Sequence, residues 1–224
     1  MKFPFMAPSS KTIACATGFE GRTLARLIVD GPLPGRVNMD KDRALLEAVA
    51  TATLPVVRLF RWSEPTVSHG RTQKEADARA FAETVGVRAV VQRPTGGGMV
   101  WHDQDLSFSI AWQRNAPGFP TCIKNVYRAL HEALAGALRE LGHDVTLYQP
   151  VPQKVPGQCF VEPVEADVMW RGRKVVGGAL RVAAGARLYQ GTLQTAALGL
   201  DAPQAQRAVR AALDRLFLFG GNEG

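Results

Sequence analysis

Three consecutive glycines, Gly96 to Gly98, follow Arg93 in the stretch "RPTGGGMVWHD" and precede His102. Glycines tolerate positive φ and let backbone N–H groups approach a ligand, and such concave backbones bind anions. The spacing is not GxGxxG, and no Lys-Ser/Thr pair follows, so a dinucleotide fingerprint and a P-loop are both excluded. Two readings remain for the stretch itself: a ligand-binding loop with Arg93 as its cation, or a plain turn between strands.

Two further residues have reactive side chains. Lys174 lies in the apolar stretch "GRKVVGGALR" beside Gly177 and Gly178. It is either a solvated edge lysine or a buried charge partner for a reacting group. Cys159, in "GQCFVEP", is either a packing residue or a nucleophile, because a nearby cation would favour its thiolate. Lys174 lies across a predicted hairpin from Cys159, so it could approach the thiol, which spacing alone does not prove.

Composition narrows the class of protein. The three cysteines are far apart and odd in number, without metal spacing, which disfavours a disulfide framework and a zinc site and favours a reducing, cytoplasmic setting. The net charge of +7 favours an anionic partner, which could be a nucleic acid, an anionic membrane or an acidic protein. No run approaches the roughly 20 apolar residues of a membrane span, and the N-terminus lacks the apolar core of a secretory signal.

The elements that must position these residues follow from hydrophobic periodicity. Helices are expected at 38–52, with Asn38 as N-cap, and at 74–86, 122–142 and 203–217. Strands are expected at 25–31, 56–62, 88–93, 105–112, 144–150 and 186–194, together with a hairpin that turns at Arg171-Gly172. Strict βαβ alternation is absent, which predicts an α/β (α+β) fold: a mixed, largely antiparallel sheet flanked by helices. One domain over 25–220 is expected, after an extension at 1–24.

Five stretches in order resemble the biotin/lipoate A/B protein ligase family over roughly residues 25 to 215. They read "ARLIVDG…NMDKDRALLEA", "VVRLFRWSEPTVSHGRTQ", "RPTGGGMVWHDQDLSFS", "CF…P…D…GRKVVGGALR" and "YQGTLQ". The resemblance implies a catalytic domain like that of class II tRNA synthetases, here without the C-terminal accessory domain of typical ligases. It also implies a role in lipoate biosynthesis and protein lipoylation, in which an octanoyl or lipoyl chain is placed on one lysine of a lipoyl domain.

The resemblance assigns roles residue by residue. The arginine–glycine loop lines the acyl pocket, and the strand lysine lies against the acyl carbonyl or a phosphate. The implied catalytic residues are Cys159 and Lys174. The implied substrate-binding residues are Arg93, Gly96, Gly97, Gly98, His102, Gly177 and Gly178, and no metal ligand is implied.

The family contains two chemistries. Lipoate-protein ligases use ATP and magnesium, whereas octanoyltransferases need no cofactor and pass the chain from acyl carrier protein through a cysteine thioester. Cys159-Phe160 with Pro163 and Lys174 resembles the Gram-positive type of octanoyltransferase, and so does "RPTGG", but Gly98 is similar to ligases. Octanoyl transfer is therefore the main expectation. ATP-dependent ligation and a non-catalytic acyl- or protein-binding role are the alternatives.

In the expected reaction, Lys174 lowers the pKa of Cys159, whose thiolate takes the chain from acyl carrier protein. The acceptor is a lipoyl domain or a glycine-cleavage H-type protein. The acidic surfaces typical of these partners suit a chain of charge +7, and neither a nucleic acid nor a membrane is expected as partner. The choice between octanoyl and lipoyl stays open.

Overall fold

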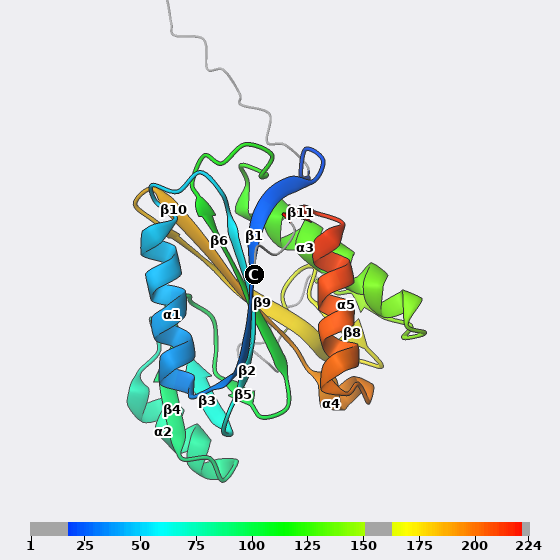
Figure 1. Ribbon diagram of the computed structural model, residues 1–224. Helices are drawn as coiled ribbons and strands as arrows, with labels where there is room; N and C mark the ends of the chain where they lie inside the picture. Colours follow the sequence, from blue (N-terminus) through cyan, green and yellow to red (C-terminus); the bar gives the residue numbers. More distant parts are fainter. Residues whose placement is uncertain (1–17, 151–162, 221–224) are drawn as a thin grey trace, which may run out of the picture.

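The computed structural model describes residues 18–150 and 163–220. Within these ranges the chain forms a large sheet of eight strands and a small sheet of three (Figure 1). The large sheet has the order β11-β1-β2-β6-β10-β9-β8-β7. Its strands are β1 (Thr23–Leu33), β2 (Val56–Trp62), β6 (Leu106–Gln113), β7 (Thr146–Leu147), β8 (Val168–Trp170), β9 (Arg173–Ala183), β10 (Ala186–Leu193) and β11 (Phe217–Phe219).

The pairing confirms the expected mixed, largely antiparallel sheet. Strand β1 is parallel to β2 and β11, and the other pairs of the large sheet are antiparallel. The hairpin between β8 and β9 turns at Arg171 and Gly172, both with positive φ, as a type I′ turn requires. The turn was therefore predictable from the Arg-Gly pair.

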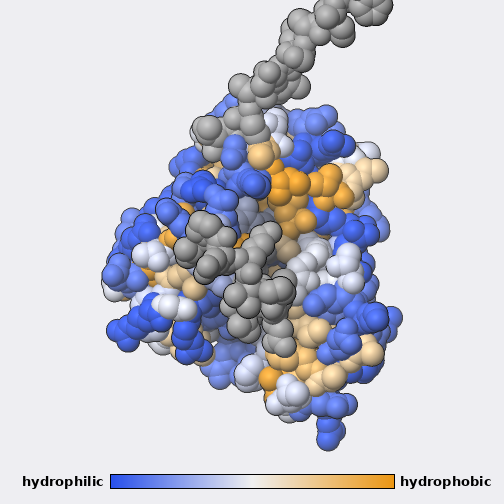
Figure 2. Space-filling model, turned by 180° about the vertical axis from the view of Figure 1, so that it is seen from behind, coloured by the Kyte–Doolittle hydropathy of each residue, from blue (hydrophilic) through white to orange (hydrophobic). Residues whose placement is uncertain are grey.

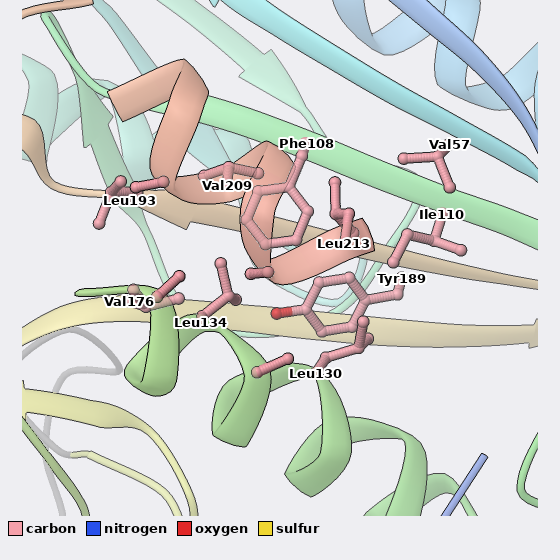
Figure 3. Close-up of a cluster of buried hydrophobic side chains, with 14 of the residues drawn as sticks. Val57, Phe108, Ile110, Leu130, Leu134, Val176, Tyr189, Leu193, Val209 and Leu213 are labelled. Carbon is pink, nitrogen blue, oxygen red and sulfur yellow. The ribbon is translucent and has the colours of Figure 1, made fainter. Parts of the chain in front are cut away.

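Helices cover both faces of the large sheet (Figure 1). Helix α1 (Gly35–Ala48) packs on one face, while α3 (Ile123–Glu140) and α5 (Ala202–Asp214) pack on the other. The short α4 (Thr195–Leu198) precedes α5. Figure 3 shows Phe108, Ile110 and Tyr189 of the sheet facing Leu130 of α3 and Leu213 of α5 in the main core. This core fixes the strands that carry the candidate site.

The small sheet was not expected from the sequence. It has the order β4-β3-β5, made by β4 (Ala89–Gln92), β3 (Thr66–His69) and β5 (Val100–His102), and it is covered by α2 (Glu75–Thr84). Strand β4 lies within the strand expected at 88–93, but β3 and β5 have four and three residues, too short for a clear periodic pattern. The glycine stretch connects β4 to β5, so this sheet carries one wall of the site.

Several predicted element boundaries were wrong; the strand expected at 144–150, for example, contains only Thr146–Leu147. Two of these errors lie at buried contacts. Asn38 is not an N-cap: α1 begins at Gly35, and the buried Asn38 amide donates to the carbonyls of Leu33 and Arg61. The last helix ends at Asp214, not 217, because Phe217 begins strand β11 and fills the core with its ring. In both places tertiary contacts outweighed the local pattern.

Within the described ranges, no helix is both long and apolar enough to cross a membrane. The face of the molecule in Figure 2 is mostly hydrophilic, with hydrophobic residues in small groups.

Candidate active site

A cavity of about 120 Å³ lies where the two sheets meet. Its walls are largely apolar, with Met39 from α1, Phe60 and Trp62 from β2 and Val100 from β5. Strands β9 and β10 supply the floor through Gly177, Gly178, Ala179, Gln190, Gly191 and Thr192. Seven of the predicted site residues line this cavity: Arg93, Gly97, Gly98, His102, Lys174, Gly177 and Gly178.

Arg93 braces the glycine loop from within. Its Nη2 donates to the carbonyls of Gly96 (2.9 Å) and Gly98 (2.7 Å). Its Nη1 donates to the Ser68 carbonyl and to the Ser68 hydroxyl, both at 2.8 Å. Four N–H groups are thus directed at protein oxygens, so the guanidinium shapes the wall of the cavity. Gly97 has φ of 88°, a backbone conformation that favours glycine.

Gly96 differs from its neighbours. It is not among the residues that line the cavity, and no atom outside its chain neighbours lies within 4 Å of the position its Cβ would take. Its carbonyl nevertheless accepts from Arg93, so it belongs to the loop without facing the cavity. Its assignment to substrate binding stays a prediction.

Gly70 was not selected from the sequence. A Cβ at this position would lie 2.1 Å from the Gly97 carbonyl oxygen, so the segment after β3 packs directly on the glycine loop. The Arg71 N–H also donates to the Thr95 carbonyl at 3.0 Å. The string "SHGRTQ" contained this residue, but its role depends on a contact with residues 27 positions away, which spacing alone does not reveal.

His102 lies in a buried polar chain. Its Nδ1 is 2.7 Å from Asp105 Oδ2, its Nε2 is 2.6 Å from Ser68 Oγ, and its ring stacks on Trp62. Because a carboxylate only accepts, Nδ1 carries a proton and donates to Asp105. Burial raises the pKa of Asp105, but the facing His102 and a hydrogen bond from Thr192 outweigh it, so the pKa is lowered.

The Ser68–His102–Asp105 order resembles a hydrolase triad, but the geometry indicates a structural role. Ser68 is fully buried, does not line the cavity and accepts a hydrogen bond from Arg93. Both ring nitrogens of His102 already have partners. The chain therefore connects the glycine loop to β6 through side chains. Asp105, three residues after His102, was the available sequence signal for it.

Lys174 is not the solvated edge lysine that one reading allowed. Its side chain is 8% exposed, and its Nζ lies 2.7 Å from Oδ2 of the fully buried Asp167. It folds over Gly177, where an added Cβ would lie 2.0 Å from Lys174 Cε and 2.5 Å from Nζ. An ammonium thus lies at the wall of an apolar cavity with a buried carboxylate behind it. That arrangement can stabilise negative charge that develops on a bound carbonyl oxygen.

The predicted nucleophile remains outside this geometry. Cys159 lies outside the described residues, as does Cys15, and the described Cys122 stands at the start of α3 and is not among the residues that line the cavity. Among the described residues, no group of three or more His, Cys, Asp or Glu side chains is placed to hold a metal ion.

Comparison with known proteins identifies the family of the chain. Residues 34–206 match the family model described as the lipoyl protein ligase A/B catalytic domain. The chain is 33% identical over 196 residues to "Octanoyltransferase LipM" of Kyrpidia tusciae, and the aligned region covers 82% of this chain and 69% of that protein. It is 30% identical over 180 residues to the protein of the same name from Geobacillus kaustophilus, and the aligned region covers 75% of this chain and 64% of the relative. The chain thus spans less than two thirds of the latter.

A solved structure shares the fold. The putative lipoate protein ligase Ta0514 from T. acidophilum, described with bound lipoic acid, has a TM-score of 0.68 and 21% identity over 88% of this chain and 89% of that one. The match supports the same arrangement of sheets and helices that surrounds the cavity. Family model, relatives and fold agree: the chain belongs to the family of lipoyl protein ligase A/B catalytic domains.

Proposed function

We propose that this chain is an acyltransferase that moves an octanoyl group from acyl carrier protein to the acceptor lysine of a lipoyl domain. The observation that carries the proposal is the Lys174 ammonium, held by Asp167 at the wall of a narrow, largely apolar cavity. The relatives named octanoyltransferase support the choice of acyl group. The largely apolar walls suit a saturated hydrocarbon chain, and the ammonium suits its carbonyl end.

In the proposed first step, the Cys159 thiolate attacks the thioester carbonyl of octanoyl-acyl carrier protein. A new C–S bond forms to Cys159, the bond to the carrier thiol breaks, and the carrier thiolate takes up a proton as it leaves. Lys174 stabilises the oxyanion that develops on the carbonyl oxygen. Cys159 precedes Val164, which lines the cavity, by five residues, and covalent geometry limits such a separation to about 18 Å.

In the second step, the neutral amine of the acceptor lysine attacks the enzyme thioester. An amide bond forms, Cys159 leaves as a thiolate, and the amine loses a proton to solvent. Neither step consumes a nucleotide. The four hydrogen bonds from Arg93 to protein oxygens support this chemistry, because they use the N–H groups that a phosphate would otherwise attract.

ATP-dependent lipoate or octanoate ligation is the alternative, and Gly98 favours it by resemblance to ligases. One experiment separates the two reactions. An apo lipoyl domain is incubated with the protein and either octanoyl-acyl carrier protein without ATP, or octanoate with ATP and magnesium. We expect the mass of the lipoyl domain to increase by one octanoyl group in the first mixture. Modification in the second mixture alone would show that the protein is a ligase.

The variant Cys159→Ala tests the thioester. We expect it to lose transfer from octanoyl-acyl carrier protein by a factor of about 10³ or more, because no covalent intermediate can form. Cys122→Ala is the matched control, since Cys122 does not line the cavity. Full activity of Cys159→Ala would rule out the intermediate. Intact mass spectrometry of the wild-type protein with the donor alone should show one added octanoyl group.

A further inference from the structure

Asp167 is a buried carboxylate that receives hydrogen bonds from three separate parts of the fold. Its Oδ2 accepts from Lys174 Nζ of β9 and from the Val164 N–H, each at 2.7 Å. Its Oδ1 accepts from the Tyr127 hydroxyl of α3, which in turn accepts from the Gly178 N–H at 3.2 Å. The carboxylate therefore connects Lys174 to the helix and to the glycine strand.

The backbone conformation just before Asp167 orients its side chain. The buried Ala166 has φ of 69°, a left-handed conformation that is unfavourable for residues with a Cβ. Hydrogen bonds hold it there: the Ala166 N–H donates to the Tyr148 carbonyl, and His131 Nδ1 donates to the Ala166 carbonyl at 2.8 Å. A strained residue that its surroundings hold in place indicates a constraint on the neighbouring side chain.

The ionisable groups around the pair are held in their neutral forms. Burial lowers the pKa of His131 to about 4, so its ring is neutral near pH 7. Burial also raises the pKa of Tyr127 and of Tyr189 well above the ordinary value, so both keep their hydroxyl protons. Asp167 therefore supplies the negative charge against Lys174. A largely buried ammonium is stable only with such a partner.

We propose that Asp167 is the positioning residue of Lys174: it holds the ammonium folded over Gly177, where the acyl carbonyl is bound. The inference rests on the proposed function for the identity of that carbonyl. Tyr127 supports the carboxylate, because its hydroxyl donates to Oδ1 while Lys174 donates to Oδ2. Asp167 acts through Lys174 and does not itself line the cavity.

The test uses Asp167→Asn in the full chain, with two independent measurements. The first is the steady-state rate of octanoyl transfer, for which we expect kcat to fall about 100-fold and KM for the donor to change little, because a displaced ammonium no longer meets the oxyanion. The second is the labelling of Lys174 by acetic anhydride at pH 8, read by peptide mass spectrometry relative to the exposed Lys124. We expect Lys174 to be labelled several times more, because it loses its counter-charge.

Two further variants make the result specific. Asp167→Glu keeps the charge and should recover much of kcat and the low labelling, whereas Tyr127→Phe keeps the carboxylate and should have a smaller effect on both. Asp42→Asn is the matched control, because it neutralises a fully buried carboxylate that pairs with Arg58 instead. It should leave Lys174 labelling unchanged. If Asp167→Asn fails to fold, Asp167→Glu and Tyr127→Phe decide the question by the same two measurements.

Two outcomes would overturn the proposal. One is a wild-type kcat in Asp167→Asn; the other is a loss of kcat with wild-type labelling of Lys174, which would mean that the carboxylate acts by another route. Failure of the proposed function is distinguishable, because the wild-type protein would then transfer no octanoyl group. Lys174 labelling would still report whether Asp167 holds the lysine.

Discussion

Gly177 and Gly178 are adjacent in sequence but have different neighbours. Adding a side chain at each position should therefore have a different effect. A Cβ at Gly177 would overlap the side chain of Lys174, whereas a Cβ at Gly178 would lie 2.3 Å from the hydroxyl of the buried Tyr189. A lysine chain can move aside, but a core ring cannot move without disturbing its packing. One substitution should therefore damage the reaction and the other the fold.

We predict that Gly177→Ala lowers kcat for octanoyl transfer by at least about tenfold with a small change in thermal stability, because Lys174 is displaced. Gly178→Ala should instead lower the free energy of unfolding by about 1–3 kcal/mol through overpacking. Urea unfolding and steady-state kinetics on both variants check this. Equal stability losses in the two variants would contradict the assignment of Lys174 to the Gly177 face.

The sequence predicted the residues that line the cavity better than those that support them. Arg93, His102 and Lys174 stood in recognisable strings, and each lines the cavity. Asp167 and Ser68 were not selected, because their roles come from contacts with residues seven and 34 positions away. Asp167 stands in the string "CF…P…D…GRKVVGGALR", but its contact with Lys174 depends on a strained turn that the spacing does not reveal.

At the scale of elements, β2 shows where the alternation of apolar and charged residues misleads. The string "VVRLFRW" correctly predicted a strand, but Arg58 faces the interior instead of solvent. It donates to Asp30 at 2.6 Å, Asp42 at 2.9 Å and Asn38 Oδ1 at 2.6 Å. These bonds attach α1 to the sheet, so the strand has two buried faces.

We predict that Arg58→Ala lowers the free energy of unfolding by about 3–5 kcal/mol, because it leaves the carboxylate of Asp42 buried without its cation. Arg79→Ala is the control: Arg79 pairs with Glu75 on α2 with both side chains largely exposed, so its loss should cost about 0–1 kcal/mol. Urea unfolding curves of the two variants give the comparison. Similar losses in both would show that Arg58 does not anchor α1.

For the whole molecule, His131 connects α3 to the sheet and to the turn before Asp167. Its Nε2 accepts from the Tyr189 hydroxyl at 2.7 Å, and its Nδ1 donates to Ala166. Burial lowers its pKa from 6.5 to about 4. Between these pH values the unfolded chain binds more protons than the folded one, so the free energy of unfolding falls as the pH falls.

We predict that His131 lowers the free energy of unfolding by about 3 kcal/mol as the pH falls from 6.5 to 4. The slope is about 1.36 kcal/mol for each pH unit. Asp30 and Asp105 also have lowered pKa values, so their stabilisation is lost only below pH 3.8, the ordinary value. Denaturant unfolding at several pH values measures the slope. His131→Gln should flatten it in this window, and an unchanged slope in that variant would exclude His131 as its cause.

The fold class was predictable for the whole molecule, but the meeting of the two sheets was not. Alternation and turn residues such as Gly172 and Gly185 fix local pairing. The small sheet depends on strands of three or four residues that are defined only by their neighbours. Its attachment to the large sheet uses pairs distant in sequence, such as Thr95 with Gln190, which local patterns do not contain.

That attachment has a consequence for how the family can change its substrate. In the described part of the chain, the two sheets share no strand, so no backbone ladder sets the width of the cavity between them. Side chains set it: Thr95 on Gln190, Trp62 on His102 and Arg181 on the Pro94 carbonyl. Substitutions at these spacers can widen or shorten the cavity while every strand keeps its partners. Acyl-chain selection can therefore evolve separately from the stability of either sheet.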